Sequence, residues 1–278
     1  MILITGATGN VGQELVAQLL ELKQAVRVFV RDERKVAYLG NRIERAVGDL
    51  DRPETLAAAM QGVDRMYLMT YETQQDINVL AAAKSAGVKH IVKLSTLEAN
   101  IPELPIGVWH HDREQLIEAS GLTWTFLRPG QFTSNALQWA RTIKQQSTVY
   151  ASYGEGKVAP IDPRDIAAVA AIALTQPGHT GQIYELTGPE LVTTREQVAI
   201  LAGVLGKSLR HVEIPPLAAK EQMLQHGMPP AVAEALTDLA IAVREGKAEQ
   251  YTDTVEKVTG CPPRPFEVWC CDHRPAFS

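Results

Sequence analysis

A glycine-rich turn near the start of the chain limits the folds that this sequence can adopt. Residues 5–12 read Thr-Gly-Ala-Thr-Gly-Asn-Val-Gly, between the apolar run Met1–Thr5 and an amphipathic segment at Val11–Leu22. Glycines at this G-x-x-G-x-x-G spacing allow a tight strand-to-helix turn, close approach of a pyrophosphate, and close packing of helix on strand. The flanking strand and helix disfavour a plain turn without a ligand. The turn therefore predicts a dinucleotide site formed by Gly6, Thr8, Gly9, Asn10, Val11 and Gly12.

The first 130 residues alternate short β-branched runs with longer helical patterns. This alternation predicts right-handed βαβ units and an α/β fold: a Rossmann-type doubly wound parallel sheet covered by helices on both faces. The predicted strands are Met1–Thr5, Ala25–Val30, Ile43–Val47, Arg65–Met69, His90–Leu94 and Thr123–Leu127, and the predicted helices are Val11–Leu22, Glu33–Leu39, Pro53–Met60, Gln74–Ala86 and Val108–Ala119.

The pattern is less regular after residue 130. We expect residues 1–130 to form the NAD(P)-binding domain, with 150–188 returning to the main sheet, and 131–149 with 189–278 to form a smaller substrate-binding lobe. That lobe would cap the carboxyl edge of the sheet, where doubly wound folds bind ligands. Helices are predicted at Asp165–Leu174, Thr194–Leu205, Pro216–His226 and Pro230–Arg244, and strands at Gln182–Leu186 and Val212–Ile214.

Composition narrows the classes of partner. The chain has 278 residues, 45% of them hydrophobic, and a net charge of −5, which disfavours nucleic acid and anionic membranes. No apolar run approaches the roughly 18 residues that cross a bilayer. The start has no basic segment typical of a signal peptide, so we expect a cytoplasmic protein. Cys261, Cys270 and Cys271 have no histidine at zinc spacing, which predicts free thiols and no metal site.

The end of the second predicted strand indicates which dinucleotide binds. NAD enzymes place an acid there, about 20 residues after the turn, to hold the ribose hydroxyls. This chain has Arg31 followed by Asp32, and a guanidinium can pair bidentately with a 2′-phosphate, which favours NADP(H). The alternative is a solvated basic segment capped by Asp32. Asp49, after the third strand, is expected either to line the adenine pocket or to cap the next helix.

Several runs resemble the NmrA-like branch of the atypical short-chain dehydrogenase/reductases. These are the T-G-A-T-G-x-x-G start, A-A-A-K-S-A-G-V-K-H-I-V-K-L-S at Ala81–Ser95, and S-G-L-T-W-T-F-L-R-P-G at Ser120–Gly130. The closing run Asp253–Glu267 is similar to NAD(P)H-dependent quinone and azo reductases of that branch. The resemblance covers nearly the whole chain. It implies either a hydride-transferring reductase or a protein that only senses the NADP(H) state.

One predicted helix bears on whether the chain is catalytic. Ordinary short-chain dehydrogenases carry Tyr-x-x-x-Lys there, whereas this chain places His110 and Glu114 at the same spacing, on one helical face. Reductases of the resembling branch often show this H-x-x-x-E pattern. We expect His110 to donate a proton near neutral pH and Glu114 to orient it. The alternative is that both are polar lining or structural residues.

Other candidate residues follow from the family's strand ends and from the aromatic content. Ser95 and Thr96 match the family's polar position near the nicotinamide, and Thr70 is placed over the ribose. Pro129 and Phe132 would pack by the nicotinamide, although Thr70 and Pro129 could equally be ordinary packing. A flat acceptor would stack on aromatic side chains. The expected pocket aromatics are Tyr71, Trp109 and Trp139, with a core role as the alternative for Trp139.

These patterns together predict an NADPH-dependent reductase of quinone-like or other planar acceptors. The alternative is a non-catalytic NADP(H) sensor, which the missing tyrosine and lysine favour. An epimerase or dehydratase of nucleotide sugars is disfavoured because those reactions depend on that tyrosine. The sequence leaves the acceptor's identity open, and both a monomer and a homodimer are compatible with it.

Overall fold

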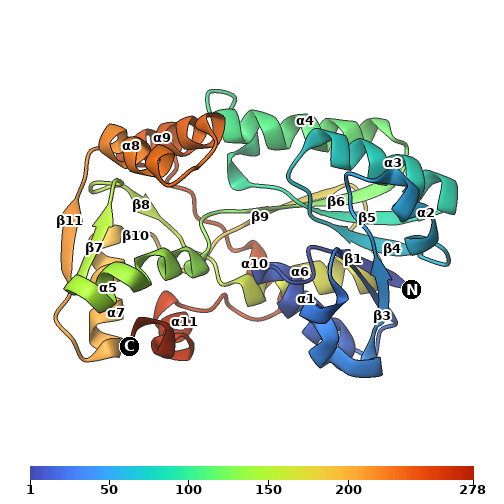
Figure 1. The fold of residues 1–278 in the computed structure, drawn as a ribbon, viewed down its shortest axis with the longest axis horizontal. Helices are drawn as coiled ribbons and strands as arrows, with labels where there is room; N and C mark the ends of the chain where they lie inside the picture. The colour runs from blue at the N-terminus through green and yellow to red at the C-terminus, as the bar shows by residue number, and fades with distance from the viewer. The chain divides into compact units, whose positions relative to one another are not determined.

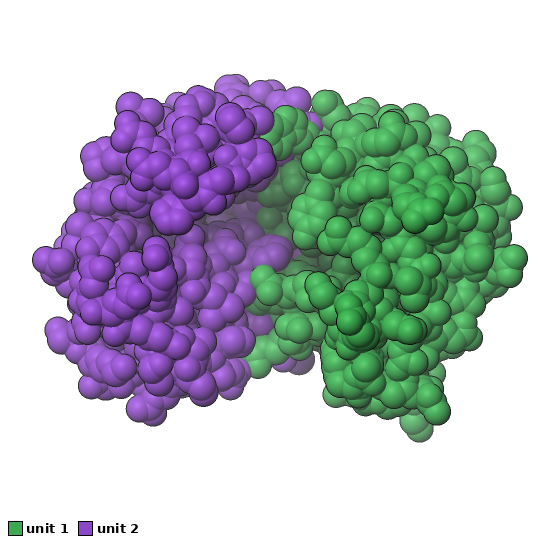
Figure 2. All heavy atoms as spheres, viewed as in Figure 1, with its two compact units in different colours: residues 1–96, 109–129, 163–185 green, residues 97–108, 130–162, 186–278 purple.

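The computed structural model describes residues 1–278, which divide into two compact units (Figure 2). Unit 1 contains residues 1–96, 109–129 and 163–185, and unit 2 contains residues 97–108, 130–162 and 186–278. The sequence predicted a smaller second lobe, whereas the two units are of nearly equal length. The chain crosses between them several times, because unit 1 takes its last helix and strand from residues beyond 160.

Unit 1 is built on a seven-stranded sheet with the order β3-β2-β1-β4-β5-β6-β9. Its neighbours from β3 to β6 pair in parallel. This order confirms the predicted Rossmann-type doubly wound sheet, with the strand order reversing beside β1. The strands are β1 (Ile2–Thr5), β2 (Val26–Val30), β3 (Glu44–Val47), β4 (Arg65–Leu68), β5 (His90–Leu94), β6 (Thr123–Pro129) and β9 (Gln182–Leu186).

Helices cover both faces of this sheet, as Figure 1 shows. On one face α1 (Asn10–Glu21) packs beside α6 (Pro163–Thr175), whose buried alanines allow close approach. On the other face lie α2 (Leu56–Ala59), α3 (Thr73–Ala86) and α4 (Pro105–Ala119). The core beneath these three helices is aliphatic and aromatic, and it includes Leu68, Val79, Ile91, Ile117 and Phe126.

Two predicted helices of unit 1 take a tighter form. Glu33–Arg42 is a 3₁₀ segment, and Gly40 within it has a φ of 58°, which ends a regular helix. The predicted helix Pro53–Met60 divides into a 3₁₀ turn at Pro53–Thr55 and the short α2. The predicted helix Val108–Ala119 begins three residues earlier, at Pro105, since proline is favoured at the first helical position.

Unit 2 contains two small sheets rather than an extension of the main one. Strand β7 (Thr148–Ala151) pairs in parallel with β11 (Arg210–Glu213), and β8 (Lys157–Val158) pairs antiparallel with β10 (Val192–Thr193). The return to the main sheet was predicted over 150–188, but it begins only at Pro163. The helices are α5 (Ala140–Gln146), α7 (Thr194–Leu205), α8 (Pro216–Gln225), α9 (Pro230–Arg244), α10 (Thr254–Thr259) and α11 (Phe266–Asp272), with 3₁₀ segments at Leu97–Asn100, Thr133–Trp139 and Arg274–Phe277.

The core of unit 2 is aromatic. Phe266 and Trp269 stack with ring centroids 5.9 Å apart, and both belong to a buried cluster with Trp139 and Leu201. Cys270 lies in this cluster, whereas Cys261 and Cys271 are exposed, and none of the three forms a disulfide. No cluster of His, Cys, Asp or Glu is arranged to hold a metal ion. No helix has the length and apolar character needed to span a bilayer.

Candidate nucleotide-binding and active site

The glycine turn of unit 1 is fixed by close backbone contacts. The Thr5 hydroxyl donates to the carbonyl of Met69 (3.1 Å) and accepts from the Met69 amide (2.7 Å), which ties the end of β1 to the end of β4. Gly6 has a φ of 65°, and a Cβ at Gly12 would lie 2.1 Å from the Gly6 carbonyl oxygen. Only glycine fits at position 12 without moving the backbone, so this turn shape depends directly on the motif.

The same turn leaves the N-terminus of α1 open. Gly9 is the N-cap and has no side chain to bond the first amides, and the first turn contains no acidic residue. Thr8, Gly9 and Asn10 are exposed. Helix N-termini have unsatisfied N–H groups and a positive dipole end, which favour an anion. The turn therefore fits the pyrophosphate of a dinucleotide.

Two neighbouring arginines after β2 differ in their partners. Asp32 accepts a bond from the Arg34 amide (3.0 Å) and two from the Arg34 guanidinium (2.9 and 2.8 Å), which lowers the pKa of Asp32. Arg31 is exposed, and its guanidinium makes no hydrogen bond or ion pair within the chain. Arg31 thus keeps all its donors for a ligand, whereas Asp32 both caps the segment and occupies Arg34.

Asp49 bonds within a local turn, and it does not cap the next helix, whose N-cap is Arg52 without a side-chain bond. The Asp49 carboxylate Oδ1 accepts from the Asp51 amide (3.1 Å), and its own amide donates to the Thr55 hydroxyl (3.1 Å). These bonds shape the turn that leads into Pro53–Thr55. Asp49 is half-buried, so it remains partly accessible after β3.

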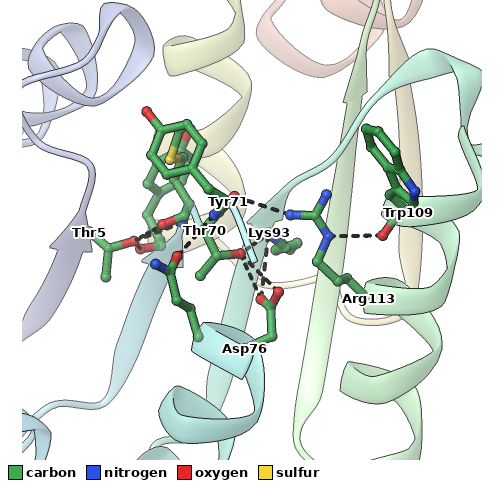
Figure 3. Close-up of polar contacts among 10 residues, drawn as sticks. Thr5, Thr70, Tyr71, Asp76, Lys93, Trp109 and Arg113 are labelled. Carbon is green, nitrogen blue, oxygen red and sulfur yellow. Dashed lines mark hydrogen bonds and ion pairs between the residues drawn. The ribbon is translucent and has the colours of Figure 1, made fainter. Parts of the chain in front are cut away.

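A buried polar cluster, which the sequence reasoning missed, joins the ends of β4 and β5 (Figure 3). The Lys93 ammonium donates to the Thr70 hydroxyl (2.7 Å), and this hydroxyl donates to the Asp76 carboxylate (2.8 Å). Lys93 Nζ and Asp76 Oδ1 lie 3.6 Å apart, and their side chains are 1% and 0% exposed. Burial lowers the pKa of Lys93 to about 8, although Asp76 opposes this shift.

Arg113 of α4 holds the same loop from another side (Figure 3). Its guanidinium Nη1 donates to the Thr70 carbonyl (3.3 Å), and its Nε donates to the Trp109 carbonyl (2.8 Å). The Thr70 hydroxyl proton is already donated to Asp76, so Thr70 can offer a ribose only a lone pair. A sequence signal for this cluster exists, because Lys93 interrupts the otherwise apolar end of a buried parallel strand, and a buried ammonium needs partners.

His110 and Glu114 do not act as the expected pair. The Glu114 carboxylate accepts two bonds from the buried Arg128 guanidinium, at 2.5 and 3.0 Å, and it does not contact His110. The imidazole Nδ1 of His110 is buried without a partner. Burial, together with the charges of Arg113 and Lys93, lowers the pKa of His110 to about 3. The expected orientation of His110 by Glu114 is therefore wrong, because Glu114 is bonded to Arg128. Proton donation by His110 stays a prediction, which its lowered pKa disfavours.

The remaining predicted residues divide between the two units. In unit 1 Ser95 is buried with no partner for its hydroxyl, and Thr96 is half-buried. Pro129 is buried at the end of β6, while Tyr71 and Trp109 are 73% and 37% exposed. Phe132 and Trp139 belong to unit 2. Trp139 has the core role that was its alternative, and one side of it also lines a pocket of unit 2.

Comparison with known proteins agrees with this geometry. A family described as NAD(P)H-binding matches residues 6–177. The chain is 41% identical to the NAD(P)H azoreductase of Xenophilus azovorans and 41% identical to a (4-alkanoyl-5-oxo-2,5-dihydrofuran-3-yl)methyl phosphate reductase of Streptomyces griseus, each alignment covering 100% of this chain and 99% of the relative. The NADPH complex of an NADPH-dependent quinone oxidoreductase from Escherichia coli superimposes with a TM-score of 0.87 at 28% identity, over 98% of this chain and 99% of that structure.

The matched region contains the features that a dinucleotide requires. It begins at Gly6 in the turn, includes Arg31 and the Lys93 cluster, and ends just after α6. The prediction of a nicotinamide dinucleotide cofactor is confirmed by this match. Because the family match covers more than half of this chain, the chain belongs to the NAD(P)H-binding family, as the NmrA-like resemblance implied.

Proposed function

We propose that this protein is an NADPH-dependent reductase of quinone-like or other planar acceptors. The observation that carries the proposal is its full-length similarity to reductases, at 41% identity, together with an open dinucleotide turn. When bound, the nicotinamide supplies a hydride, so the chain needs only to bind, orient and exclude water. The absence of the usual tyrosine and lysine is compatible with such an acceptor, since its reduction needs only one added hydride and a proton.

Each part of the cofactor has residues that would hold it. The amides at the start of α1 would bind the pyrophosphate, and the unpaired Arg31 guanidinium would bind the 2′-phosphate. Asp49, half-buried after β3, stays a prediction for lining the adenine pocket. The Lys93 cluster fixes Thr70 and the start of the following loop, which we assign to the ribose and nicotinamide side. Pro129 and Phe132 remain predictions for packing by the nicotinamide ring.

The acceptor would meet groups that are neutral at pH 7. Ser95 and His110 stay predictions for contacting the acceptor; their unpartnered atoms, Ser95 Oγ and His110 Nδ1, are buried in this structure. With its pKa lowered to about 3, His110 acts as a neutral hydrogen-bonding group, and the proton that completes the reduction comes from water. Thr96, Tyr71 and Trp109 stay predicted lining residues. A cytoplasmic location, a monomer or homodimer, and the absence of a nucleic-acid partner likewise stay predictions.

A panel of acceptors tests this function. Purified protein is mixed anaerobically with NADPH and a series of quinones and azo dyes, and the absorbance of the reduced nicotinamide is followed. We expect oxidation of NADPH with at least one planar acceptor and a slower reaction with NADH. The second candidate, an NADP(H) sensor, is favoured by the absence of the usual Tyr-x-x-x-Lys pair and by the separation of His110 from Glu114. Tight NADPH binding with no oxidation by any acceptor would establish the sensor instead.

A further inference from the structure

A pocket of about 1100 Å³ lies within unit 2. Its walls come from the segment 131–142, from β7 and the residues after it, and from α8, α9 and the turn that joins them. This volume lies just above the roughly 300–1,000 Å³ of typical small-molecule sites, so it is large enough for a molecule with two or three rings. The lining includes Trp139, Tyr150, Met223 and Met228, whose flat or adaptable side chains suit an aromatic ligand.

The permanently charged side chain that lines this pocket is a cation. Arg141 lines the pocket, and the lining contains no aspartate, glutamate or lysine. Arg141 is exposed, and its guanidinium makes no hydrogen bond or ion pair within the chain. The imidazole of His226, which also lines the pocket, is bonded through Nδ1 to the Gln222 carbonyl (2.7 Å). A guanidinium that no carboxylate neutralises favours an oxyanion in this pocket.

Uncharged polar groups accompany Arg141 in the lining. The amide side chains of Asn135 and Gln138 line the pocket and are exposed. Amide N–H groups can donate to an oxyanion. The lining therefore offers one cation and neutral donors, on walls that otherwise suit a flat ring system.

We propose that this pocket binds the acceptor, and that Arg141 selects planar acceptors with an anionic substituent such as a sulfonate, carboxylate or phosphate. This inference rests on the reductase function proposed above. Guanidinium pairs with such oxyanions through two parallel hydrogen bonds, which gives both affinity and orientation. The relative from Streptomyces griseus is named for a phosphate-bearing molecule, which supports the same chemical class.

Binding of a matched ligand pair tests the proposal without any turnover. Naphthalene-2-sulfonate and naphthalene-2-sulfonamide share size and shape, and only the first is charged. Calorimetric titration of the full chain should show the sulfonate binding at least about tenfold more tightly, the range of a charge-assisted pair near a surface. Equal affinities, or no binding of either ligand, would overturn the proposal.

Variants assign the preference to one side chain. Arg141→Gln should reduce the sulfonate preference to within about twofold, and Arg141→Lys should restore part of it because the charge is kept. Lys144→Gln is the matched control, since Lys144 is an exposed cation of the same helix that does not line the pocket. A preference that survives Arg141→Gln, or that is lost in Lys144→Gln, would contradict the assignment.

Turnover of a second pair separates this inference from the proposed function. 1,2-Naphthoquinone-4-sulfonate and 1,2-naphthoquinone differ only by the anion. We expect kcat/KM to favour the sulfonate, and Arg141→Gln to lower this ratio about tenfold. Reduction of both quinones at equal kcat/KM would sink the pocket proposal and leave the reductase intact. Selective binding of the naphthalene sulfonate, with no NADPH oxidation by these quinones or by any acceptor of the panel above, would sink the reductase and leave the anion site intact.

Discussion

The glycine turn and the Lys93 cluster both belong to unit 1, but the polar groups of the turn lack partners within the chain and those of the cluster have them. At the turn, the amides of α1 lack a side-chain cap and Arg31 lacks a partner, so donors face outward. In the cluster, Lys93, Thr70 and Asp76 satisfy one another while almost fully buried. An exposed polar group without a partner can bond a ligand, whereas a buried polar group that is already bonded holds the surrounding chain in place.

This difference predicts that the two regions fail in different ways when mutated. Changes at the open turn should weaken cofactor binding and leave folding largely intact. Changes in the closed cluster should first weaken folding. Measuring both the free energy of unfolding and the dissociation constant of NADPH on each variant puts the comparison to the test.

The largest effect is expected for Lys93→Met. It leaves the buried Asp76 carboxylate without its cation, and removing one partner of a buried ion pair costs about 3–5 kcal/mol of unfolding free energy. Denaturant titration measures this loss. The double variant Lys93→Met/Asp76→Asn should recover most of it, because no uncompensated charge remains. Equal losses in the single and double variants would mean that Lys93 contributes packing rather than charge.

A pH effect follows from His110, which lies under the influence of Lys93 and Arg113. Its folded-state pKa of about 3 lies below the usual histidine value of 6.5, so between these values the unfolded chain binds a proton at His110 that the folded chain does not bind. This stability is therefore present above pH 6.5 and is lost as the pH falls toward 3. The loss is about 1.4 kcal/mol per pH unit, or about 2 kcal/mol between pH 6.5 and 5.

Comparison of His110→Gln with the parent chain isolates this contribution. His90, whose pKa burial lowers to about 4, adds a similar slope in both proteins, so the difference between them reports His110 alone. A difference that stays constant from pH 7 to 5 would show that His110 is protonated equally in both states.

At the open turn, Arg31→Ala should raise the dissociation constant of NADPH about tenfold and leave that of NADH unchanged. The reason is the loss of a charge-assisted pair with the 2′-phosphate, worth about 1.4 kcal/mol or more. Fluorescence titration of both cofactors measures the change. The midpoint of thermal unfolding should stay near that of the parent chain, since Arg31 is exposed and makes no hydrogen bond or ion pair within it. Loss of affinity for both cofactors alike would rule out a phosphate contact.

The smallest effect is expected for Arg34→Ala, the matched control. Its guanidinium is held by Asp32 on an exposed surface, where ion pairs contribute little. Affinity for NADPH should change less than about threefold. If Arg34→Ala instead weakened NADPH more than Arg31→Ala, the phosphate site would be centred on the wrong arginine.

The sequence predicted the parts that depend on local pattern. The turn and the parallel, doubly wound sheet follow from glycine spacing and from strand–helix alternation, and His90–Leu94 and Thr194–Leu205 were predicted with their observed bounds. The strands β7, β8 and β10 were missed. Two residues, as in β8 and β10, carry no periodicity, and β7 lies outside the regular strand–helix alternation that revealed the equally short β1, β3 and β4.

The site residues were predictable from the sequence only where their contacts lie within the same short motif. Glycine is required at position 12 because a Cβ there would collide with the Gly6 carbonyl oxygen. Both residues belong to the motif, so the sequence alone predicts this requirement. The partners of Glu114 and Lys93 come from other strands and helices. Glu114 therefore was paired with His110 by helical spacing, although Arg128 binds it in the fold. Spacing on one helix identifies a shared face, and the fold decides which distant side chain meets that face.

One measurement tests the central claim most directly, namely that the open dinucleotide site of this chain supports hydride transfer. NADPH and a planar quinone are mixed anaerobically with the protein, and NADPH consumed is compared with hydroquinone formed. We expect one hydroquinone for each NADPH, at a rate that rises in proportion to protein concentration and falls in Arg31→Ala at limiting NADPH. Saturable NADPH binding with no hydroquinone from any planar acceptor would contradict it.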